Sequence, residues 1–541
     1  MPEQNSEAKR FGCPSCGGGL RWDIGAHTLI CERCATAVDP KTLADPGEDA
    51  GDDMEVVSYQ CPQCGAQIVS GTSEATSFCT YCGADVVLSQ RFARMRRPDL
   101  IVPFRVDRNA CEEQYRAFIR REYFVPGRLK KQETIRNFRP IYVPFWAYSV
   151  RIEGKQTVVI GQTVGDYYDT SRVELDASFT DENILYDASV AFEDETAARL
   201  AHTLEGAVPF REGYLSGMYA QIPDVGPEVY EKEAKASAAL AFAEALRIKM
   251  KAAELRFDPT RTNQAIDEPT VERKLVLLPV WLLASRRQER VLYTAVSGTD
   301  GRVVCDPPVS YVRIGVLAAL LAVLLFVLLM LAGTIPAVGL SAVASLLSIL
   351  SLRTVVPVYT DSLFREMRAG EPDFGKPAAF MGQNQRRLME KQKRIALRDS
   401  AMPGSGMADG CLSTILSFAL RLLLVIGIAP LAFFVTNWHY PVLITAVILG
   451  VITCVRSFRW LRDLPRSRDR AQFTAMVSAG FILVLAMAVA TILDPAEDLI
   501  HYGLSFAALV LNTGILLMLA IWRNRFSSRP IPFFEEVDTD A

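Results

Sequence analysis

The spacing of hydrophobic residues divides this chain of 541 residues into two unlike parts. Up to about residue 310, apolar residues come in short runs separated by polar ones, as in a water-soluble domain. After that point, apolar runs reach about 20 residues, the length that crosses a bilayer as a helix. We predict an all-α membrane domain with a helical hairpin at 314–356 and four further helices at 411–522. The six expected spans are Ile314–Gly333, Ala337–Val356, Ser417–Thr436, Trp438–Val455, Phe473–Leu493 and Ile500–Ile521.

The connections between these spans alternate in charge. A basic loop at 359–410, an arginine-rich loop at 456–470 and the tail at 523–541 alternate with short connections that contain no Lys or Arg. By the positive-inside rule, this pattern predicts a multi-pass protein of the cytoplasmic (inner) membrane with both termini in the cytosol. The polar N-terminus shows no apolar signal segment, which agrees with a cytosolic head. Arg353 and Arg421 lie inside weaker spans, where they either snorkel to the interface or serve a transport pathway.

The soluble part predicts an α+β domain at 98–310. A segment rich in Ala, Glu, Lys and Leu, Glu228–Leu255, predicts a long helix. A second, amphipathic helix is indicated by apolar residues at helical spacing, which are Tyr115, Phe118, Ile119 and Tyr123. Strand-like runs occur at Leu100–Val106, Ile141–Ile152, Gln156–Val164, Leu275–Ala284, Val291–Val296 and Arg302–Cys305.

Three of these strands contain a proline beside large apolar residues. They read Val-Pro-Phe around Pro103, Val-Pro-Phe-Trp around Pro144 and Leu-Pro-Val-Trp around Pro279. Strands tolerate proline at an edge, at a strand start or at a bulge. We therefore expect structural corners with buried aromatic side chains at these places.

Eight of the twelve cysteines form two copies of one spacing, C-x2-C-x14-C-x2-C. Two CxxC turns together offer four thiolates, the donor set of a closed tetrahedral Zn2+ site. Glycines follow at Gly17, Gly65 and Gly83, where the chain must bend around the metal. We predict two structural zinc sites in two small β modules, ribbon 1 (9–38) and ribbon 2 (58–90). The predicted ligands are Cys13, Cys16, Cys31 and Cys34 in ribbon 1, and Cys61, Cys64, Cys79 and Cys82 in ribbon 2.

Other interpretations of the cysteines are a disulfide framework or redox CxxC pairs. A cytosolic head disfavours disulfides, and the sequence around the cysteines lacks the βαβ pattern of redox motifs. A closed four-thiolate site leaves no position for water or substrate, so it does not catalyse. The segment Gly370–Pro377 matches GxxxxGK but ends in proline instead of the Ser or Thr that holds Mg2+. We therefore predict that the protein is not an enzyme.

Charge is close to balanced overall, with a formal net charge of -3, but it is unevenly distributed. The segment 39–57 holds seven acids and one base and predicts a flexible linker that lets the ribbons move independently. By contrast, Arg91–Arg139 holds fourteen bases and six acids. This basic region is interpreted as a solvated helix face, as a surface for anionic lipid headgroups, or as a nucleic-acid surface. Ribbon 2 carries no Lys or Arg from Gln60 to Gln90, so nucleic acid is not expected as a partner.

Several motifs follow one another in a recognisable order. They are the CPxCG turns of the ribbons, a Val-Pro-Phe strand, a basic helix, Tyr142–Trp146, the Tyr-Leu-Ser-Gly segment Tyr214–Gly217 and Leu278–Leu283. Over about residues 10–310, this order resembles a family of bacterial zinc-ribbon membrane proteins. Members often carry helicase-like or transcription-factor-like (TFIIB-type) labels, and some relatives are associated with phage-shock-protein-A-like and SPFH-domain proteins of membrane stress responses. The resemblance implies a membrane platform that recruits partners.

The sequence therefore predicts a multidomain protein with two zinc ribbons, an α+β soluble domain and a polytopic membrane domain. Its expected function is a membrane-anchored scaffold that offers a docking surface to a cytosolic protein, with the lipid bilayer as its other partner. The alternative function is a transporter or channel with a regulatory zinc-binding head. A nucleic-acid-binding sensor is the third.

Overall fold

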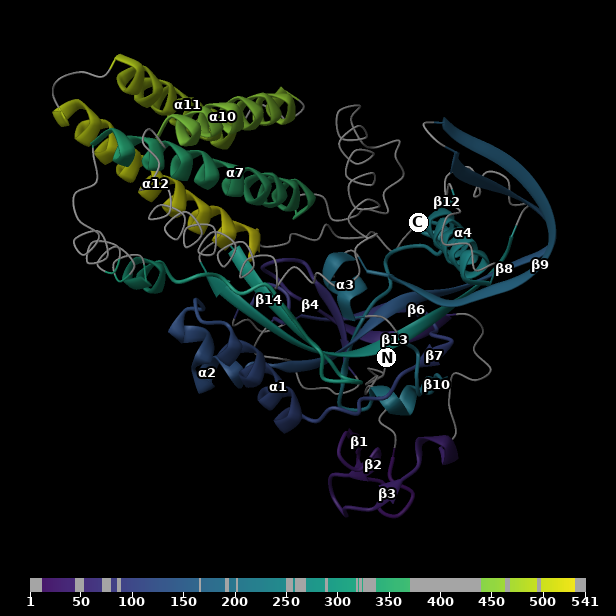
Figure 1. Ribbon diagram of the computed structural model, residues 1–541. Coiled ribbons are helices and arrows are strands. Elements are labelled where there is room, and N and C mark those ends of the chain that lie inside the picture. The colour runs from purple at the N-terminus through teal and green to yellow at the C-terminus, as the bar shows by residue number, and fades with distance from the viewer. Residues whose placement is uncertain are drawn as a thin grey trace.

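The computed structural model has a sheet-rich N-terminal region and a helical C-terminal region, as predicted for a multidomain chain. A small sheet lies at one end of the molecule, a large sheet with short helices lies in the middle, and long helices lie at the other end (Figure 1). The structure describes residues 12–43, 53–70, 79–84, 89–164, 167–189, 194–200, 203–249, 256–257, 269–287, 290–317, 320, 324, 337–369, 439–462, 468–493 and 498–530.

The small sheet belongs to ribbon 1 and has three antiparallel strands in sequence order. In its first strand, Leu20 and Trp22 are buried while the residues between and after them are exposed, the alternation expected of a strand with one covered face. A short 3-10 helix, η1 (Pro40–Thr42), follows the sheet. The strands are β1 (Leu20–Asp23), β2 (Thr28–Cys31) and β3 (Ala37–Val38).

The large sheet has thirteen strands. They are β4 (Asp53–Gln60), β5 (Gln67–Ser70), β6 (Ser89–Arg96), β7 (Leu100–Ile101), β8 (Arg139–Val164), β9 (Tyr167–Asp187), β10 (Val208–Pro209), β11 (Tyr219–Gln221), β12 (Arg256–Phe257), β13 (Thr270–Arg287), β14 (Arg290–Ser297), β15 (Val303–Cys305) and β16 (Arg529–Pro530). The main path runs β10-β7-β13-β8-β11-β5-β4-β6, and the other strands pair beside it. The two runs predicted at 141–152 and 156–164 are therefore one strand, β8.

Prolines lie inside the two central strands, where sheets usually exclude them. Pro144 lies in β8 at the place where its neighbour changes from β11 to β9, and Pro279 lies in β13 where its neighbour changes from β7 to β14. Since proline has no amide hydrogen, it leaves no donor unpaired in such a gap. The prediction of an edge, start or bulge position is wrong for these two residues.

Aromatic side chains beside these prolines are buried, as predicted. The indole nitrogen of Trp146 donates to the carbonyl oxygen of Val225 at 2.8 Å, and that of Trp281 donates to Val106 at 2.9 Å. Phe104 packs edge-on against Trp281 with ring centroids 5.7 Å apart. These contacts give the head a core in which each of these two indole N–H groups keeps a partner.

Ribbon 2 is part of the large sheet and not a separate module. Strand β4 pairs with β6 from Asp53 to Gln60, and β5 pairs with β11 of the α+β domain. The predicted linker at 39–57 therefore ends at Asp53, where β4 begins. Because ladder hydrogen bonds join ribbon 2 to the central strands, the prediction of independent movement is wrong for ribbon 2.

Short helices pack on the head. They are α1 (Arg108–Arg121), α2 (Gln132–Ile135), α3 (Asp194–Leu200) and α4 (Glu231–Lys249). Strands β8 and β9 form a long curved hairpin beside α4 (Figure 1). Phe179 of β9 contacts Phe242 of α4 with ring centroids 5.5 Å apart. The predicted long helix at 228–255 is thus confirmed with narrower bounds, and β9 was not predicted.

The helical region has four long helices within the described residues, α7 (Ala337–Ala369), α10 (His439–Arg462), α11 (Arg468–Leu493) and α12 (Asp498–Phe526). Two stretches, Phe473–Leu493 and Asp498–Arg525, are long and apolar enough to cross a membrane, and Ala337–Arg353 and Val442–Val455 are shorter apolar helices. The described residues thus hold two such spans, and not the six predicted. Most of the span expected at 314–333 and all of that at 417–436 lie outside the described residues.

The ends of the helical region also differ from the prediction. Helix α7 continues to Ala369, so the basic loop predicted from 359 begins at least eleven residues later. Helix α12 continues to Phe526, and β16 then pairs with β14 of the head. The first part of the predicted free tail at 523–541 is therefore helix and strand. The near-phosphate-loop motif at 370–377 and Arg421 lie outside the described residues.

Candidate metal centres

Four CxxC turns have one backbone geometry. In the first turn, the amide of Gly17 donates to the carbonyl of Cys13 at 2.8 Å, and the amide of Cys13 donates to Gly18 at 2.7 Å. The other three turns repeat both bonds. Gly17, Gly65 and Gly83 adopt positive φ at the turn, as predicted. In the second turn, Cys31–Cys34, the same position holds Ala35, with φ 58. A search for glycine at this position does not find Ala35. Ala35 nevertheless directly follows the second cysteine of its turn, as the glycines do in the other three turns.

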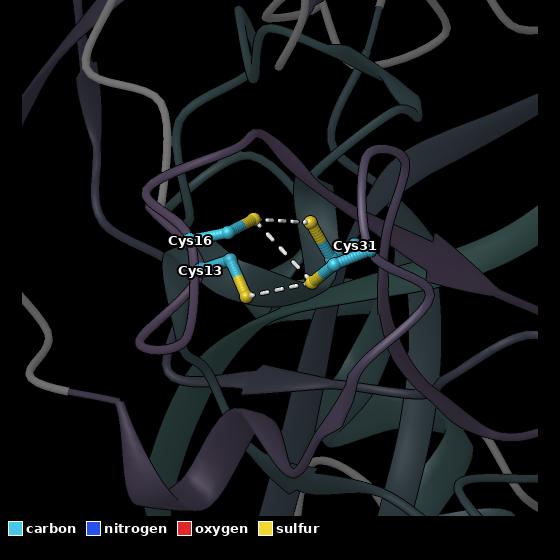
Figure 2. Close-up of side chains that lie close together, drawn as sticks. Cys13, Cys16 and Cys31 are labelled. Atoms are coloured by element: carbon cyan, nitrogen blue, oxygen red, sulfur yellow. Dashed lines mark hydrogen bonds between the residues drawn. The ribbon is translucent and has the colours of Figure 1, made fainter.

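The sulfurs of each ribbon converge on one point. In ribbon 1, the Cys13–Cys34, Cys16–Cys31 and Cys16–Cys34 sulfurs lie 3.6, 3.5 and 3.3 Å apart. Figure 2 shows three of these side chains, Cys13, Cys16 and Cys31, turned toward a common centre. In ribbon 2, the Cys61–Cys82 and Cys64–Cys79 sulfurs lie 3.8 Å apart.

These distances agree with a tetrahedral metal and not with disulfides. Four sulfurs at about 2.3 Å from a tetrahedral ion lie about 3.8 Å from one another, whereas disulfide sulfurs lie about 2.05 Å apart. Two groups of four Cys could each hold a metal ion, and they are the two predicted quartets. The four-thiolate donor set fits Zn2+, and it leaves no ligand position for a substrate. We name the quartet of ribbon 1 the first cysteine cluster and that of ribbon 2 the second cysteine cluster.

The first cysteine cluster is partly open to solvent. Cys34 is exposed and Cys16 is half-buried, while Cys13 and Cys31 are buried. Hydrogen bonds from the Thr36 hydroxyl and amide lower the pKa of Cys34 to about 6. These hydrogen bonds favour the thiolate, the form that binds metal. Sequence reasoning missed Thr36, and its place two residues after the last ligand is the signal that could have found it.

The second cysteine cluster has all four of its residues buried. Cys61, Cys64, Cys79 and Cys82 are each at most 1% exposed. They belong to one apolar core together with residues of β8 and β13, such as Ile141 and Leu282. Hydrogen bonds from Cys64, Cys79 and Cys82 hold the pKa of Cys61 far below its usual value. A Cβ on Gly83 would lie 3.3 Å from the carbonyl oxygen of Ala284, so the turn also packs directly on β13.

Ribbon 1 docks on a segment from the middle of the chain. The amide of Trp22 donates to the carbonyl of Ser216 at 2.9 Å, and the rings of Trp22 and Tyr214 have centroids 5.1 Å apart. Arg21 lies over Gly217, where a Cβ would come within 2.5 Å of its Cγ. The 3-10 helix η3 (Glu212–Leu215) supplies this platform. Residues 214–217 therefore hold ribbon 1 on the head.

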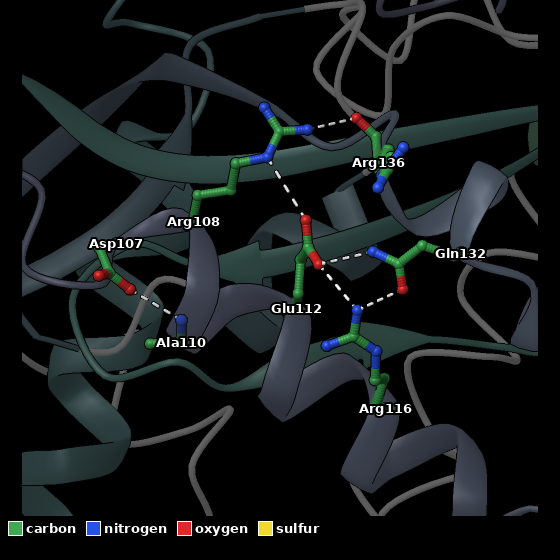
Figure 3. A network of polar contacts seen from close by, with 7 residues as sticks. All are labelled: Asp107, Arg108, Ala110, Glu112, Arg116, Gln132 and Arg136. Carbon is green, nitrogen blue, oxygen red and sulfur yellow. Dashed lines mark hydrogen bonds and ion pairs between the residues drawn. The ribbon is translucent and has the colours of Figure 1, made fainter.

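The basic region folds around a buried carboxylate. Glu112 of α1 accepts hydrogen bonds from Arg108, Arg116 and Gln132, which ties α1 to the start of α2 (Figure 3). Burial alone would raise the pKa of Glu112, but bonds from Gln132, Arg108 and Arg116 hold it below its usual value. The predicted amphipathic helix is confirmed with Tyr115 and Ile119 buried, but Tyr123 lies beyond its end and is exposed.

Polar side chains line a seam between α7 and α12. The Oγ of Ser341 lies 3.2 Å from Nδ1 of His501, and the amide nitrogen of Asn512 donates to Ser348 at 3.0 Å. The second contact joins α12 to α7. Within the described residues, Nε2 of His501 and Oδ1 of Asn512 have no hydrogen-bond partner. Arg353, one of the two arginines predicted inside spans, is exposed on α7.

Comparison with known proteins shows a likeness to one uncharacterized bacterial protein. The uncharacterized protein YdjG of Bacillus subtilis (strain 168) is 25% identical over 316 residues, which cover 56% of this chain and 90% of that protein. No family model matches the chain, and no solved structure matches it. The likeness assigns no chemistry, so the function must be argued from the geometry of the chain itself.

Proposed function

We propose that this protein is a membrane-anchored zinc-ribbon scaffold that presents ribbon 1 to a cytosolic protein partner. In this proposal both cysteine clusters hold Zn2+ with a structural role. One observation carries it: the first cysteine cluster lies at the end of the head farthest from the long helices, with Cys34 exposed there (Figure 1). A closed thiolate site supplies rigidity without catalysis, which suits a docking module.

The position of ribbon 1 supports binding of another protein. Its exposed residues include Glu32 and Arg33, which lie inside the last CxxC turn. Its covered side is occupied by the platform at Tyr214–Gly217. A phage-shock-protein-A-like or SPFH-domain protein is the class of partner that we propose, on the resemblance described above. Nucleic acid is not proposed, because the exposed pair in this turn is one acid and one base.

We further propose a multi-pass topology with both termini in the cytosol. Strand β16 follows the last helix, α12, and pairs with β14 of the head. A head before the helices and a strand after them that share one sheet must lie on the same side of a bilayer, so the number of crossings is even. The two spans within the described residues meet this condition. A reporter that is active only outside the cytosol should stay inactive when fused after Ala541.

Affinity purification from solubilised membranes tests the scaffold function. The tagged full-length chain is compared with Glu32→Lys/Arg33→Glu, which exchanges two charges on ribbon 1 without touching a cysteine. The matched control, Glu272→Lys/Lys274→Glu, makes the same exchange at two exposed residues of β13. We expect a cytosolic protein to be recovered with the unchanged chain and the control, and to be lost with the ribbon 1 variant. Equal recovery from all three would contradict a docking role for ribbon 1.

A transporter is the second candidate, and the seam between α7 and α12 is the observation that favours it. Ser341, Ser345 and Ser348 are fully buried on α7, and His501 is 1% exposed on α12. Ionisable residues inside membrane helices often mark the pathway of an ion or substrate. Flux of small cations into reconstituted vesicles that is lost in His501→Leu would favour this function. Absence of flux from the unchanged chain would contradict it.

A further inference from the structure

The end of α1 and the loop after it, residues 120–131, concentrate positive charge beside the helical region. Residues 120–131 contain five bases and one acid, and all five bases are exposed. The acid, Glu122, is half-buried, and burial raises its pKa although Arg523 of α12 partly offsets the shift. The exposed bases are Arg120, Arg121, Arg128, Lys130 and Lys131.

This loop is rigidly attached to the head. Val125 and Leu129 are each 2% exposed and join the apolar core, and the Tyr115 hydroxyl donates to the carbonyl of Leu129 at 3.1 Å. The Glu112 network then fixes the start of α2 against α1 (Figure 3). The bases are thus displayed on a preformed surface, which costs little conformational entropy when a ligand binds.

The same loop contacts the chain where it enters the helical region. The amide of Ser310 donates to the carbonyl of Phe124 at 2.7 Å. Arg313 donates to the carbonyl of Tyr123 and lies over its ring, 6.0 Å from the centroid. Residues 311–317 are helical, and the apolar run at 314–333 begins within them.

A candidate membrane helix also ends here. The amide of Val309 donates to the side-chain oxygen of Asn524 at 2.6 Å, and the side-chain nitrogen of Asn524 donates back to Val309 at 3.1 Å. Asn524 lies in the last turns of α12, whose stretch Asp498–Arg525 is long and apolar enough to cross a membrane. The basic loop therefore lies at the level where that helix would leave the hydrocarbon.

Exposed aromatic and aliphatic side chains complete the surface. Tyr123 is 63% exposed, Tyr311 41% and Val312 75%. Tyrosine is enriched at membrane interfaces, where its ring lies among the headgroups and its hydroxyl stays wet. Exposed bases beside such residues are attracted to anionic lipids.

We propose that residues 120–131, with Tyr123, Tyr311 and Arg313, form a binding surface for the headgroups of anionic phospholipids. The ligand is the phosphate-bearing surface of the same bilayer that the helices cross. The surface aligns the head on the membrane, with ribbon 1 directed away from it. This inference rests on the membrane anchoring in the proposed function, but not on the identity of any protein partner.

Hydrogen exchange of the full-length chain in nanodiscs tests the proposal. The discs contain phosphatidylcholine alone or with increasing fractions of phosphatidylglycerol. We expect amides of residues 120–131 to exchange more slowly as the phosphatidylglycerol fraction rises, and the protection to weaken with added salt. A base near an anionic surface adds about a fivefold gain in affinity. Lys130→Gln/Lys131→Gln should therefore weaken the affinity for phosphatidylglycerol by roughly 25-fold.

The matched control is Lys41→Gln/Lys232→Gln, which removes two exposed bases outside this surface and should keep the protection. Exchange that is equal in both kinds of disc would contradict the lipid surface while leaving the scaffold function intact. The same protection by inorganic phosphate in pure phosphatidylcholine discs would contradict the membrane as the source of the ligand. A chain that fails to enter nanodiscs at all would contradict the membrane anchoring itself.

Discussion

Ribbon 1 and ribbon 2 carry the same cysteine spacing, yet the chain surrounds them differently. The first cysteine cluster has an exposed and a half-buried residue and sits on a platform of a few residues. The second has four buried residues and lies in the core of a thirteen-stranded sheet. The spacing determines the ligand geometry in both. The strands on either side determine whether the metal supports a local module or the whole head.

The largest expected effect is the loss of a ligand from the second cysteine cluster. Structural zinc contributes about 10–16 kcal/mol, and the net stability of a domain is about 5–15 kcal/mol. Cys64→Ser should therefore unfold the head, seen as loss of strand signal in circular dichroism and rapid proteolysis of the full-length chain. Cys34→Ser, the corresponding change in the first cluster, should leave β8 and β13 protected. Equal damage from the two variants would remove the distinction between the ribbons.

A smaller effect on stability is expected when the contact between ribbon 1 and its platform is removed. Trp22 is 4% exposed and packs on Tyr214, so Trp22→Ala should destabilise ribbon 1 by about 3–5 kcal/mol, as for other buried aromatic residues. Hydrogen exchange should become fast in β1 and β2 and stay slow in β4 and β5. Faster exchange in all four strands would show that the ribbons unfold together.

Gly217 allows a milder test of the same platform. Its φ is +77, and a Cβ there would meet the flexible side chain of Arg21. Gly217→Ala should cost about 1–2 kcal/mol from the left-handed backbone conformation, measured as earlier proteolytic cleavage within ribbon 1. Gly127→Ala is a matched control, because nothing lies within 4 Å of a Cβ at that position. An equal response of the two variants would contradict a role for Gly217 in docking.

The weakest expected effect concerns pH and the Glu112 network, which belongs to neither ribbon. The pKa of Glu112 is lowered in the folded chain, so the carboxylate stabilises α1 and α2 above the usual Glu value of about 4.3. This stabilisation, about 1 kcal/mol, is lost as the pH falls through the lowered value. Exchange of α1 amides should therefore accelerate in acid, and Glu112→Gln should remove that dependence. An unchanged acid response in the variant would assign it to other groups.

The cysteine quartets could be predicted from the sequence because their signal is local. All eight cysteines converge as their spacing requires, and the glycines at 17, 65 and 83 have the expected backbone conformation. The place of ribbon 2 in the sheet could not be predicted, because the paired residues of β4 and β6 lie 29 to 43 positions apart and β5 pairs with β11 from another part of the chain. Strand β9 could have been predicted, because Val173, Leu175, Ala177 and Phe179 alternate with polar residues along it.

In the membrane region, the sequence predicts the apolar length of the helices but not their ends or their contacts with the head. Hydropathy identifies apolar length, and it agrees with α11 and α12. It does not show that α12 continues to Phe526 or that β16 returns to the head, since both depend on contacts such as that of Arg290 with Arg525. Likewise, an edge, strand start or bulge was predicted for Pro144 and Pro279, because a sequence does not reveal where a central strand changes its neighbour.

Zinc content and zinc release from the purified full-length chain test the central claim most directly. The account predicts two zinc ions per chain by elemental analysis, as the two cysteine clusters require. On addition of a thiol-reactive mercurial and a chromogenic chelator, one ion should be released quickly from the first cluster, and the other only as the head unfolds. Cys34→Ser should remove the fast phase alone. A chain without zinc, or one that releases both ions in a single phase, would contradict the account.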